Sequence, residues 1–316
     1  MKRPREIVES SLLVALAVVL FLASYVLPVV GMVFAFLCPA PLVVLGLRHN
    51  LARALLGLAV ATILVSLFVG ISGAFFFVLS FGVLGVGLGF LSKRYRNSVE
   101  IILYGVLISL GGKLLLMIVL AKLTGVNPFD VRPEEMMSII DKVASIYNNV
   151  GMSEEALNTA RAQMVATLDV IPKIFPALLI MASAVDCFLS YGVSRLVLRR
   201  LGSNELPPIR PFGRWSFPKS IFWVFLLSGV LIFMGFRGSF PELFLRIGLN
   251  LRLLSSGLLM LQGLSVFWFY MSYKKVKKVI RLVLLGIVVL FPLLTQIILI
   301  LGIIDMWIDL RAKIGR

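Results

Sequence analysis

The positive charges of this chain collect in every second gap between its long apolar segments. They stand before the first segment, after the second and after the fourth, whereas the gap after the third, between Gly70 and Gly73, carries no charge. The basic residues of these gaps are Lys2, Arg3, Arg5, Arg48, Arg53, Lys93, Arg94 and Arg96. Because membrane proteins keep Lys and Arg in their cytoplasmic loops, this alternation predicts a chain that crosses a membrane several times, with its N-terminus in the cytoplasm.

The composition indicates that lipid is the solvent of the fold. Apolar residues make up 60% of the chain and charged residues 15%, yet the formal net charge is +16. A soluble fold cannot bury that much apolar surface, so we expect the lipid bilayer to be the main partner. The basic residues flank apolar segments instead of gathering on a polar domain, which suits anionic headgroups and argues against nucleic acid.

Nine segments come close to the roughly 20 apolar residues that a helix needs to cross the bilayer. They are Ile7–Leu27, Met32–Leu47, Leu51–Val69, Ala74–Leu91, Ile101–Leu123, Ile171–Val197, Ser220–Phe236, Leu253–Tyr273 and Leu282–Ile304. The ninth contains Pro292, and as one straight span it would place Arg311, Lys313 and Arg316 outside, against the charge rule. A broken or re-entrant hairpin would return the C-terminus to the cytoplasm. We predict an all-α, polytopic transmembrane helical bundle of eight or nine spans, with nine slightly favoured by segment length.

One long gap, residues 124–170, has the opposite charge from the basic gaps. It contains seven acidic and three basic side chains, and by parity it lies outside. Pro133 and Ser153 are each followed by two glutamates, which is typical of helix starts. Apolar residues follow both starts at helical spacing. We predict a short amphipathic-helical insert of two helices, on the outer membrane surface or over the bundle.

The gap at residues 200–219 combines prolines, aromatic rings and basic groups. Pro207, Pro208 and Pro211 prevent a continuous helix and favour extended backbone. The candidate binding residues of this loop are Pro207, Pro208, Arg210, Pro211, Phe212, Arg214, Trp215 and Phe217. They suit an interfacial belt at headgroup depth, or anchors for a cytoplasmic protein partner. The chain then divides into a five-span half (1–123), the outer insert (124–170), a sixth span (171–199), this loop (200–219) and the C-terminal spans (220–316).

Two charged residues lie deep inside apolar segments. Lys113 lies 13 residues beyond Glu100 in the fifth segment, and Asp186 lies 13 residues before Arg199 in the sixth. At about 1.5 Å per residue, both are roughly 20 Å from the cytoplasmic ends of their helices. Opposite charges at equal depth on consecutive spans predict a Lys113–Asp186 ion pair. The pair is either the polar floor of a substrate cavity, a proton-coupled switch, or a structural clamp between two helices.

Other candidates for chemistry are few. Arg246, Asn250 and Arg252 precede the eighth segment, where they would attract an anion at a cavity mouth or extend to lipid headgroups. The single histidine, His49, has no metal-ligand companions, and both cysteines lie inside apolar segments. The chain has no P-loop, GxSxG or HExxH motif. We therefore expect no metal, no cofactor and no catalytic residues.

The sequence also resembles known membrane families. The basic start, a first span with small residues, and Cys38-Pro39-Ala40-Pro41 leading to Gly46-Leu-Arg48 resemble the substrate-binding S components of energy-coupling-factor transporters, over about residues 1–200. The whole chain, with Leu206-Pro-Pro-Ile-Arg-Pro-Phe-Gly-Arg-Trp-Ser-Phe-Pro218, resembles the YybS-like family of uncharacterised bacterial integral membrane proteins, which is thought to be distantly related to S components.

The resemblance implies a helical bundle in a bacterial cytoplasmic membrane that binds a small molecule from outside, while separate chains supply an ATP-driven module. S components have six spans and dock on that module through an Ala-x-x-x-Ala face of the first helix, which Ser11-x-x-x-Ala15 approximates here. We therefore expect a non-enzymatic membrane subunit that binds or transports a small solute. The alternative is a non-transporting scaffold or regulator that recruits cytoplasmic partners through Pro207–Pro218.

Overall fold

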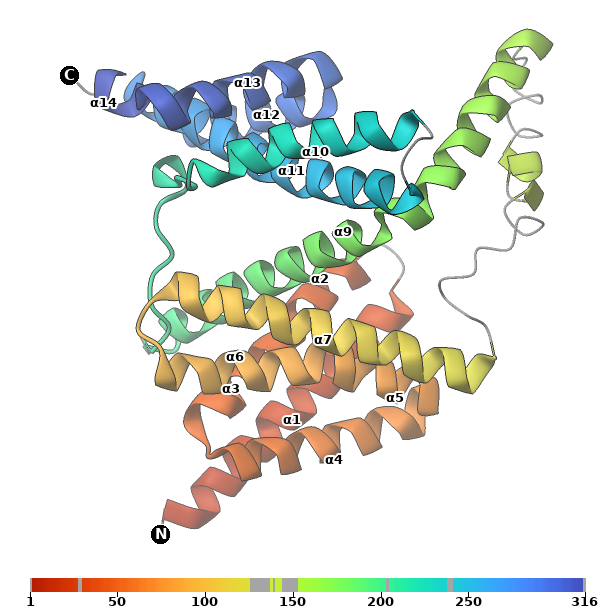
Figure 1. Ribbon diagram of the computed structural model, residues 1–316. Coiled ribbons are helices and arrows are strands. Elements are labelled where there is room, and N and C mark those ends of the chain that lie inside the picture. Colours follow the sequence, from red (N-terminus) through yellow and green to blue (C-terminus); the bar gives the residue numbers. More distant parts are fainter. Residues whose placement is uncertain are drawn as a thin grey trace. The chain divides into compact units, whose positions relative to one another are not determined.

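The computed structural model describes residues 2–27, 30–125, 137–138, 140–143, 153–202, 205–237 and 241–314. The elements in these ranges are helical, and the chain divides into two compact units (Figure 1). Unit 1 contains Met1–Arg132 and Leu179–Ile209, and unit 2 contains Pro133–Leu178 and Arg210–Arg316. The division falls inside one long helix, α9 (Glu154–Arg200), which belongs to unit 2 up to Leu178.

Among the described residues, seven helical stretches are long and apolar enough to cross a bilayer. They are Glu6–Val26, Gly31–Arg48, Leu51–Val69, Ile71–Arg94, Ser98–Thr124, Val170–Arg200 and Glu242–Tyr273. An eighth stretch passes the same test only as a bent pair of helices, and a ninth helix is apolar but shorter. The polytopic helical membrane bundle predicted from the sequence is therefore confirmed.

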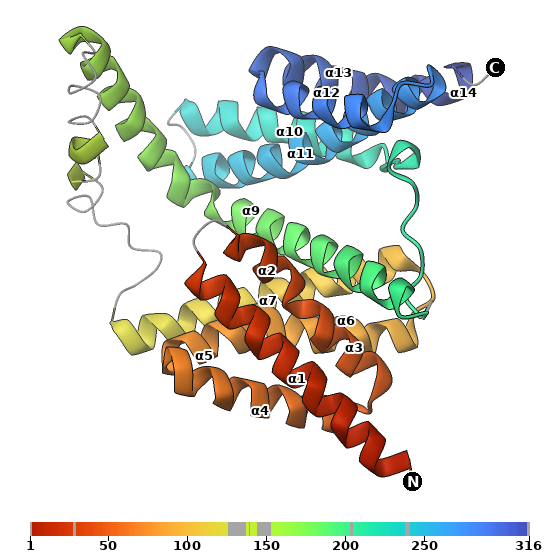
Figure 2. The same cartoon turned by 180° about the vertical axis from the view of Figure 1, so that it is seen from behind.

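Unit 1 is built from the first six predicted spans. Its helices in chain order are α1 (Lys2–Val26), α2 (Gly31–Leu37), α3 (Pro39–Arg48), α4 (Leu51–Val69), α5 (Ile71–Phe77), a π-helical segment (Val78–Gly82), α6 (Val83–Arg94), α7 (Ser98–Thr124) and the last part of α9. Figure 2 shows α1, in red, packed against α3 and α4. The second span is composite, since α2 continues into α3 at Cys38. Pro39 and Pro41 lie in the first turn of α3, where a missing backbone N–H sacrifices no helical hydrogen bond.

Polar caps and glycines set the ends of several unit 1 helices. The Asn50 side chain accepts a hydrogen bond from the Arg53 backbone N–H at 3.0 Å and caps the start of α4. Gly70, with φ of 87°, separates α4 from α5 in a conformation that favours glycine. These signals produce the tight uncharged turn that follows the third predicted span.

Glycines bring α3 and α6 into backbone contact. A Cβ atom added to Gly46 would lie 2.7 Å from the Val86 carbonyl oxygen, and one added to Gly89 would collide with the Val43 carbonyl oxygen. Small residues let helices in lipid approach closely, and the packing of backbones then replaces the hydrophobic effect as the source of association. This contact joins the second and fourth spans within the core of unit 1.

Unit 2 contains the first part of α9 and the C-terminal helices. The latter are a 3-10 turn (Phe212–Arg214), α10 (Ser220–Phe236), α11 (Glu242–Tyr273), α12 (Lys278–Leu290), α13 (Pro292–Ile308) and α14 (Leu310–Ile314). α10 coincides with the seventh predicted segment. α11 begins at Glu242, well before the predicted Leu253, because the acidic Glu242 favours the first turn of the helix. Arg246, Asn250 and Arg252 therefore lie inside α11 and not before it.

The ninth predicted segment is not a straight span. α12 and α13 meet at Phe291 with a bend of 105°. Pro292 has no N–H to donate to the Val288 carbonyl oxygen, which instead accepts a hydrogen bond from the Thr295 hydroxyl at 3.0 Å. The prediction of one straight ninth span is therefore wrong, and the bent alternative is the one that forms.

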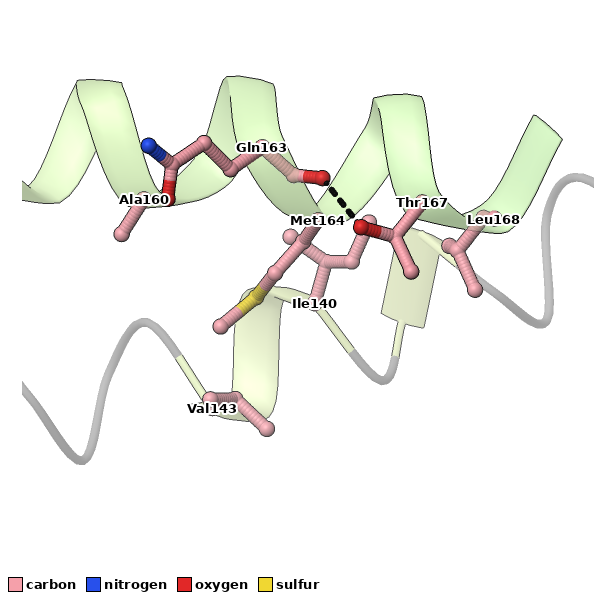
Figure 3. Close-up of a pocket in the computed structure, with 7 residues that line it drawn as sticks. All are labelled: Ile140, Val143, Ala160, Gln163, Met164, Thr167 and Leu168. Atoms are coloured by element: carbon pink, nitrogen blue, oxygen red, sulfur yellow. Dashed lines mark hydrogen bonds between the residues drawn. The ribbon is translucent and has the colours of Figure 1, made fainter. Parts of the chain in front are cut away.

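The second helix predicted for the outer insert is not a separate short element. It is the beginning of α9, which continues into the sixth span through Pro172 and Pro176. The first predicted helix falls largely outside the described residues, although 140–143 are helical. Between 140–143 and α9 lies a cavity of about 380 Å³ (Figure 3). Its lining residues are Ile140, Val143, Ala160, Gln163, Met164, Thr167 and Leu168.

Two glycines lie where α11 and α13 cross. A Cβ atom added to Gly263 would overlap the Ile298 carbonyl oxygen, and one added to Gly302 would collide with the Leu259 carbonyl oxygen and lie 2.9 Å from the Gly263 nitrogen. The backbones of the two helices are therefore in direct contact, so this position has no room for a larger side chain.

We expect Gly302→Leu to lower the free energy of unfolding by about 3 kcal/mol, because the new side chain must separate α11 from α13. Denaturation of the purified protein in mixed micelles measures the effect. Gly286→Leu is the matched control, since a Cβ atom at Gly286 meets nothing within 4 Å. An equal loss in both variants would show that glycine removal itself, and not the helix contact, causes the change.

Candidate functional site

The ion pair predicted from the sequence is present within unit 1. Lys113 Nζ on α7 lies 2.5 Å from Asp186 Oδ2 on α9. The same ammonium group donates a hydrogen bond of 2.8 Å to the hydroxyl of Ser109, one turn earlier on α7. Both charged residues lie near the middle of their spans, Ser98–Thr124 and Val170–Arg200.

Small residues on α7 let α9 come close enough for the pair to form. Gly105 and Ser109 are buried on the same face of α7. A Cβ atom added to Gly105 would lie 2.5 Å from Cys187 Sγ, and the Cys187 thiol donates to the Ile102 carbonyl oxygen at 3.4 Å. Because Asp186 directly precedes Cys187, this contact holds its carboxylate beside α7.

The two charges are unequally covered. The Lys113 side chain is 16% exposed, whereas the Asp186 side chain is 41% exposed. A charge in the middle of a span costs about 3 kcal/mol or more unless it is paired or hydrated. Lys113 has two partners in unit 1, so its ammonium group is compensated. The Asp186 carboxylate keeps an accessible surface that can accept a hydrogen bond from water or from a solute.

Asn250 bridges α11 and α9 within unit 2. Its side-chain Oδ1 accepts from the Ala177 backbone N–H at 2.7 Å, and its Nδ2 donates to the Lys173 carbonyl oxygen at 2.7 Å. In a regular helix these two backbone groups bond to each other. Pro176 disturbs that pattern because it has no N–H and its ring displaces the carbonyl four residues earlier. Asn250 thus satisfies backbone groups at the proline site.

Arg246 and Arg252 have partners of their own. Arg246 lies 3.3 Å from the Glu242 carboxylate, one turn away on α11. The Arg252 guanidinium lies 3.6 Å from the centroid of the Phe225 ring on α10, a cation–π contact. The Asn250 Nδ2 also donates to the Arg246 backbone carbonyl oxygen at 2.7 Å. The two guanidinium groups have different partners, so the described contacts do not bring them together into one anion site.

The Pro/aromatic/basic loop begins in unit 1, where its backbone is held by side chains. The Tyr191 hydroxyl donates to the Pro207 carbonyl oxygen at 2.7 Å. The Ser98 hydroxyl donates to the Pro208 carbonyl oxygen at 3.1 Å. A proline has no backbone N–H to donate, so its carbonyl oxygen is its one backbone hydrogen-bonding group, and both carbonyl oxygens are bonded here.

The aromatic part of the loop belongs to unit 2 and packs on α11. The Ser265 hydroxyl donates to the Phe212 carbonyl oxygen at 2.6 Å, and the Phe212 and Trp215 rings meet edge to face with centroids 5.2 Å apart. The Trp215 indole N–H donates to the Arg210 carbonyl oxygen at 2.9 Å. Both rings and Phe217 are half-buried, while Arg210, Pro211 and Arg214 are exposed. The aromatic rings therefore pack within unit 2, whereas the basic side chains of the loop are exposed to the surroundings.

Unit 2 also contains a buried polar cluster that the sequence did not predict. Gln262 Nε2 on α11 donates to Asp305 Oδ2 on α13 at 2.7 Å, and Arg311 Nη2 lies 3.2 Å from the same oxygen. Arg311 also donates to the Trp215 carbonyl oxygen at 2.6 Å, and Gln262 Oε1 accepts from the Phe217 backbone N–H at 2.8 Å. A straight ninth span would have separated Arg311 from the loop. The positive-inside rule favoured the same side of the membrane for Arg311 and for the loop at residues 200–219. It was therefore the signal that could have predicted this cluster.

Helical spans and a charged pair at mid-span define an integral membrane protein of the polytopic helical class. The chain matches the family described as "Predicted membrane protein (DUF2232)" over residues 15–306, and it belongs to that family. It is also similar to "Uncharacterized protein YybS" of Bacillus subtilis (strain 168), with 26% identity over 320 residues, covering 99% of this chain and 100% of the relative. The resemblance to the YybS-like family is confirmed. No solved structure is a significant match.

Proposed function

We propose that this protein binds a small solute through unit 1, with the Lys113–Asp186 pair as the polar floor of the site. The exposure of Asp186 carries the proposal. A pair that only clamps two helices is most stable when the partners cover both charges. Here 41% of the Asp186 side chain is accessible at mid-span, where a carboxylate needs water or a ligand. A solute with a hydrogen-bond donor or a cationic group would meet that need.

Two features of unit 1 support a subunit that resembles an energy-coupling-factor S component. Unit 1 contains six spans, the number expected for S components, although the sixth begins in unit 2. Ser11 and Ala15 are exposed on α1, so the face that corresponds to the S-component docking surface is uncovered. We propose that a separate ATP-driven membrane module docks there, and that this chain itself catalyses no reaction.

The alternating charges support an orientation for the proposed subunit. Arg48 and Arg94 end α3 and α6, and Arg199 and Arg200 end α9, so these three ends carry the basic residues. We propose that they face the cytoplasm of a bacterial inner membrane, together with the N-terminus. A solute would then approach Asp186 from the opposite side of the membrane.

The test is a double variant, Lys113→Gln with Asp186→Asn, which removes both charges but keeps groups able to hydrogen-bond. We expect the double variant to fold. We also expect it to retain at least tenfold less of the solute that co-purifies with the wild type, as measured by mass spectrometry of the denatured, purified protein. Lys122→Gln is the control, since Lys122 lies exposed in the last turn of α7. Equal solute retention in the double variant and the control would contradict a binding role for the pair.

A scaffold role is the second candidate, and the anchored loop favours it. The half-buried rings hold the loop in one conformation, and this conformation presents the Arg210 and Arg214 side chains. A pre-formed basic surface suits an acidic protein partner. The same purification distinguishes the candidates: a protein that co-purifies with the wild type, but not with Arg210→Ala plus Arg214→Ala, supports the scaffold. A protein partner found without any solute would exclude the first proposal.

A further inference from the structure

Unit 1 contains a second polar feature, far along the helices from the Lys113–Asp186 pair. A cavity of about 430 Å³ opens where α3 and α6 end, and we name it the basic-end pocket. Its lining includes Leu47, Lys93, Tyr95, Arg96, Glu205 and Pro207. The proposed solute site uses none of these residues.

Two cations line the basic-end pocket. Lys93 Nζ donates to the His49 carbonyl oxygen, which fixes the ammonium group and leaves two further N–H donors for a ligand. Arg96 is exposed, and the described part of the chain gives its guanidinium no ion-pair partner. Lys and Arg side chains are the usual donors to a phosphate group in proteins.

The pocket also contains groups that recognise hydrogen-bond donors. The Glu205 carboxylate accepts hydrogen bonds, and the Tyr95 hydroxyl both donates and accepts. A bare anion would be repelled by Glu205, whereas a phosphate ester with a hydroxyl or an amine could use the cations and the carboxylate together. The mixed charges therefore favour an ester over inorganic phosphate.

The depth of the basic-end pocket fits the polar edge of the bilayer. Leu47 is the second-to-last residue of the span Gly31–Arg48, and Lys93 is the second-to-last residue of the span Ile71–Arg94. Basic pockets between helices at this depth are suited to lipid headgroups, whose phosphates lie just outside the hydrocarbon. Leu47 and Pro207 add an apolar wall that an acyl or glycerol carbon can contact.

We propose that the basic-end pocket binds a phosphate ester that carries a hydroxyl or amine group. This is the chemistry of a phospholipid headgroup such as phosphatidylglycerol, and also of soluble glycerol 3-phosphate. Lys93 and Arg96 bind the phosphate, and Glu205 accepts a hydrogen bond from the hydroxyl or amine.

The experiment uses the full-length protein in two arms. In the first, native mass spectrometry measures phosphatidylglycerol retained from nanodiscs of phosphatidylglycerol and phosphatidylcholine. In the second, calorimetry measures glycerol 3-phosphate binding in phosphatidylcholine nanodiscs. Arg96→Gln should reduce binding about tenfold or more in whichever arm shows it, because a charged hydrogen bond is lost. Among the described residues, Arg96 has no hydrogen bond or ion pair that this change would break, so the variant remains testable if Lys93→Gln misfolds.

Arg94→Gln is the matched control, because Arg94 is exposed next to Lys93 but does not line the pocket. Loss with Arg96→Gln and not with Arg94→Gln supports the proposal, and the arm that shows binding identifies a lipid or a soluble ester. Equal loss in both variants would overturn it, since general surface charge would then explain the binding. Absence of binding of either probe to the wild type would also overturn it.

Discussion

Replacing Asn250 by Ala should lower the free energy of unfolding by about 3–5 kcal/mol, because the Ala177 N–H and the Lys173 carbonyl both lose a hydrogen-bond partner. Water that could replace the amide is scarce within a span, so the two groups stay unsatisfied. Denaturation of the purified protein in mixed micelles measures the loss. Asn250→Asp should cost at least as much as Asn250→Ala, because a carboxylate oxygen would replace the donor and lie against the Lys173 carbonyl oxygen.

Two controls show whether the proline site causes this effect. Arg246→Ala, one turn away, removes an exposed pair on the same helix and should cost less than about 1 kcal/mol. Pro176→Ala restores an N–H to α9, so in this background Asn250→Ala should cost less than in the wild type, which a double-mutant cycle measures. An unchanged cost in that background would contradict the bridging role of Asn250.

The second large expected effect is that removing Asp186 should lower the free energy of unfolding more than removing Lys113. Among the described residues, Asp186→Ala leaves the better-covered Lys113 with the Ser109 hydroxyl as its one partner, and we expect a loss of about 3–5 kcal/mol. Lys113→Ala leaves a carboxylate that is 41% exposed, so its loss should be smaller. Unfolding of the single variants in mixed micelles measures both, with Lys122→Ala as the exposed control on the same helix.

The reversed pair, Lys113→Asp with Asp186→Lys, tests the partnership itself. If the two residues are partners, the reversed protein should be more stable than either Lys113→Asp or Asp186→Lys alone. A double variant no more stable than the single ones would show that they act independently. The neutral Lys113→Gln, Asp186→Asn protein should be close to the wild type in stability, because neither partner leaves an unpaired charge behind.

The sequence predicted features that depend on depth along one helix. The Lys113–Asp186 pair followed from counting residues to the predicted cytoplasmic ends of two consecutive spans, and the structure joins the two residues at 2.5 Å. Span positions followed from apolar length, because each helix must satisfy its own backbone in lipid. α10, for example, occupies the residues predicted for the seventh span.

Partners chosen across helices were not predictable in this way. Asn250 was read as part of a polar group with Arg246 and Arg252, whereas its amide is directed to α9. The partners of Asp305 could not be predicted from depth along a helix, because Gln262 and Arg311 approach it only through the packing of α13 against α11 and the turn that follows α13. The contact of the half-buried Trp215 ring with Phe212 also depends on how the loop folds, and the role of Trp215 as an anchor for other proteins stays a prediction.

By itself the sequence determined that this protein is a polytopic helical membrane protein, where most of its spans lie, and which two charges meet at mid-span. Those properties follow from the transfer of apolar residues and charges into lipid, which acts on each segment separately. The tertiary structure decided between a straight and a bent segment at Pro292, and it alone showed the bridge at Asn250, the cluster at Asp305 and the basic-end pocket. Helices in lipid associate through close packing and hydrogen bonds between particular side chains, and apolar patterning does not show which helices will meet unless, as for Lys113 and Asp186, opposite charges lie at equal depth.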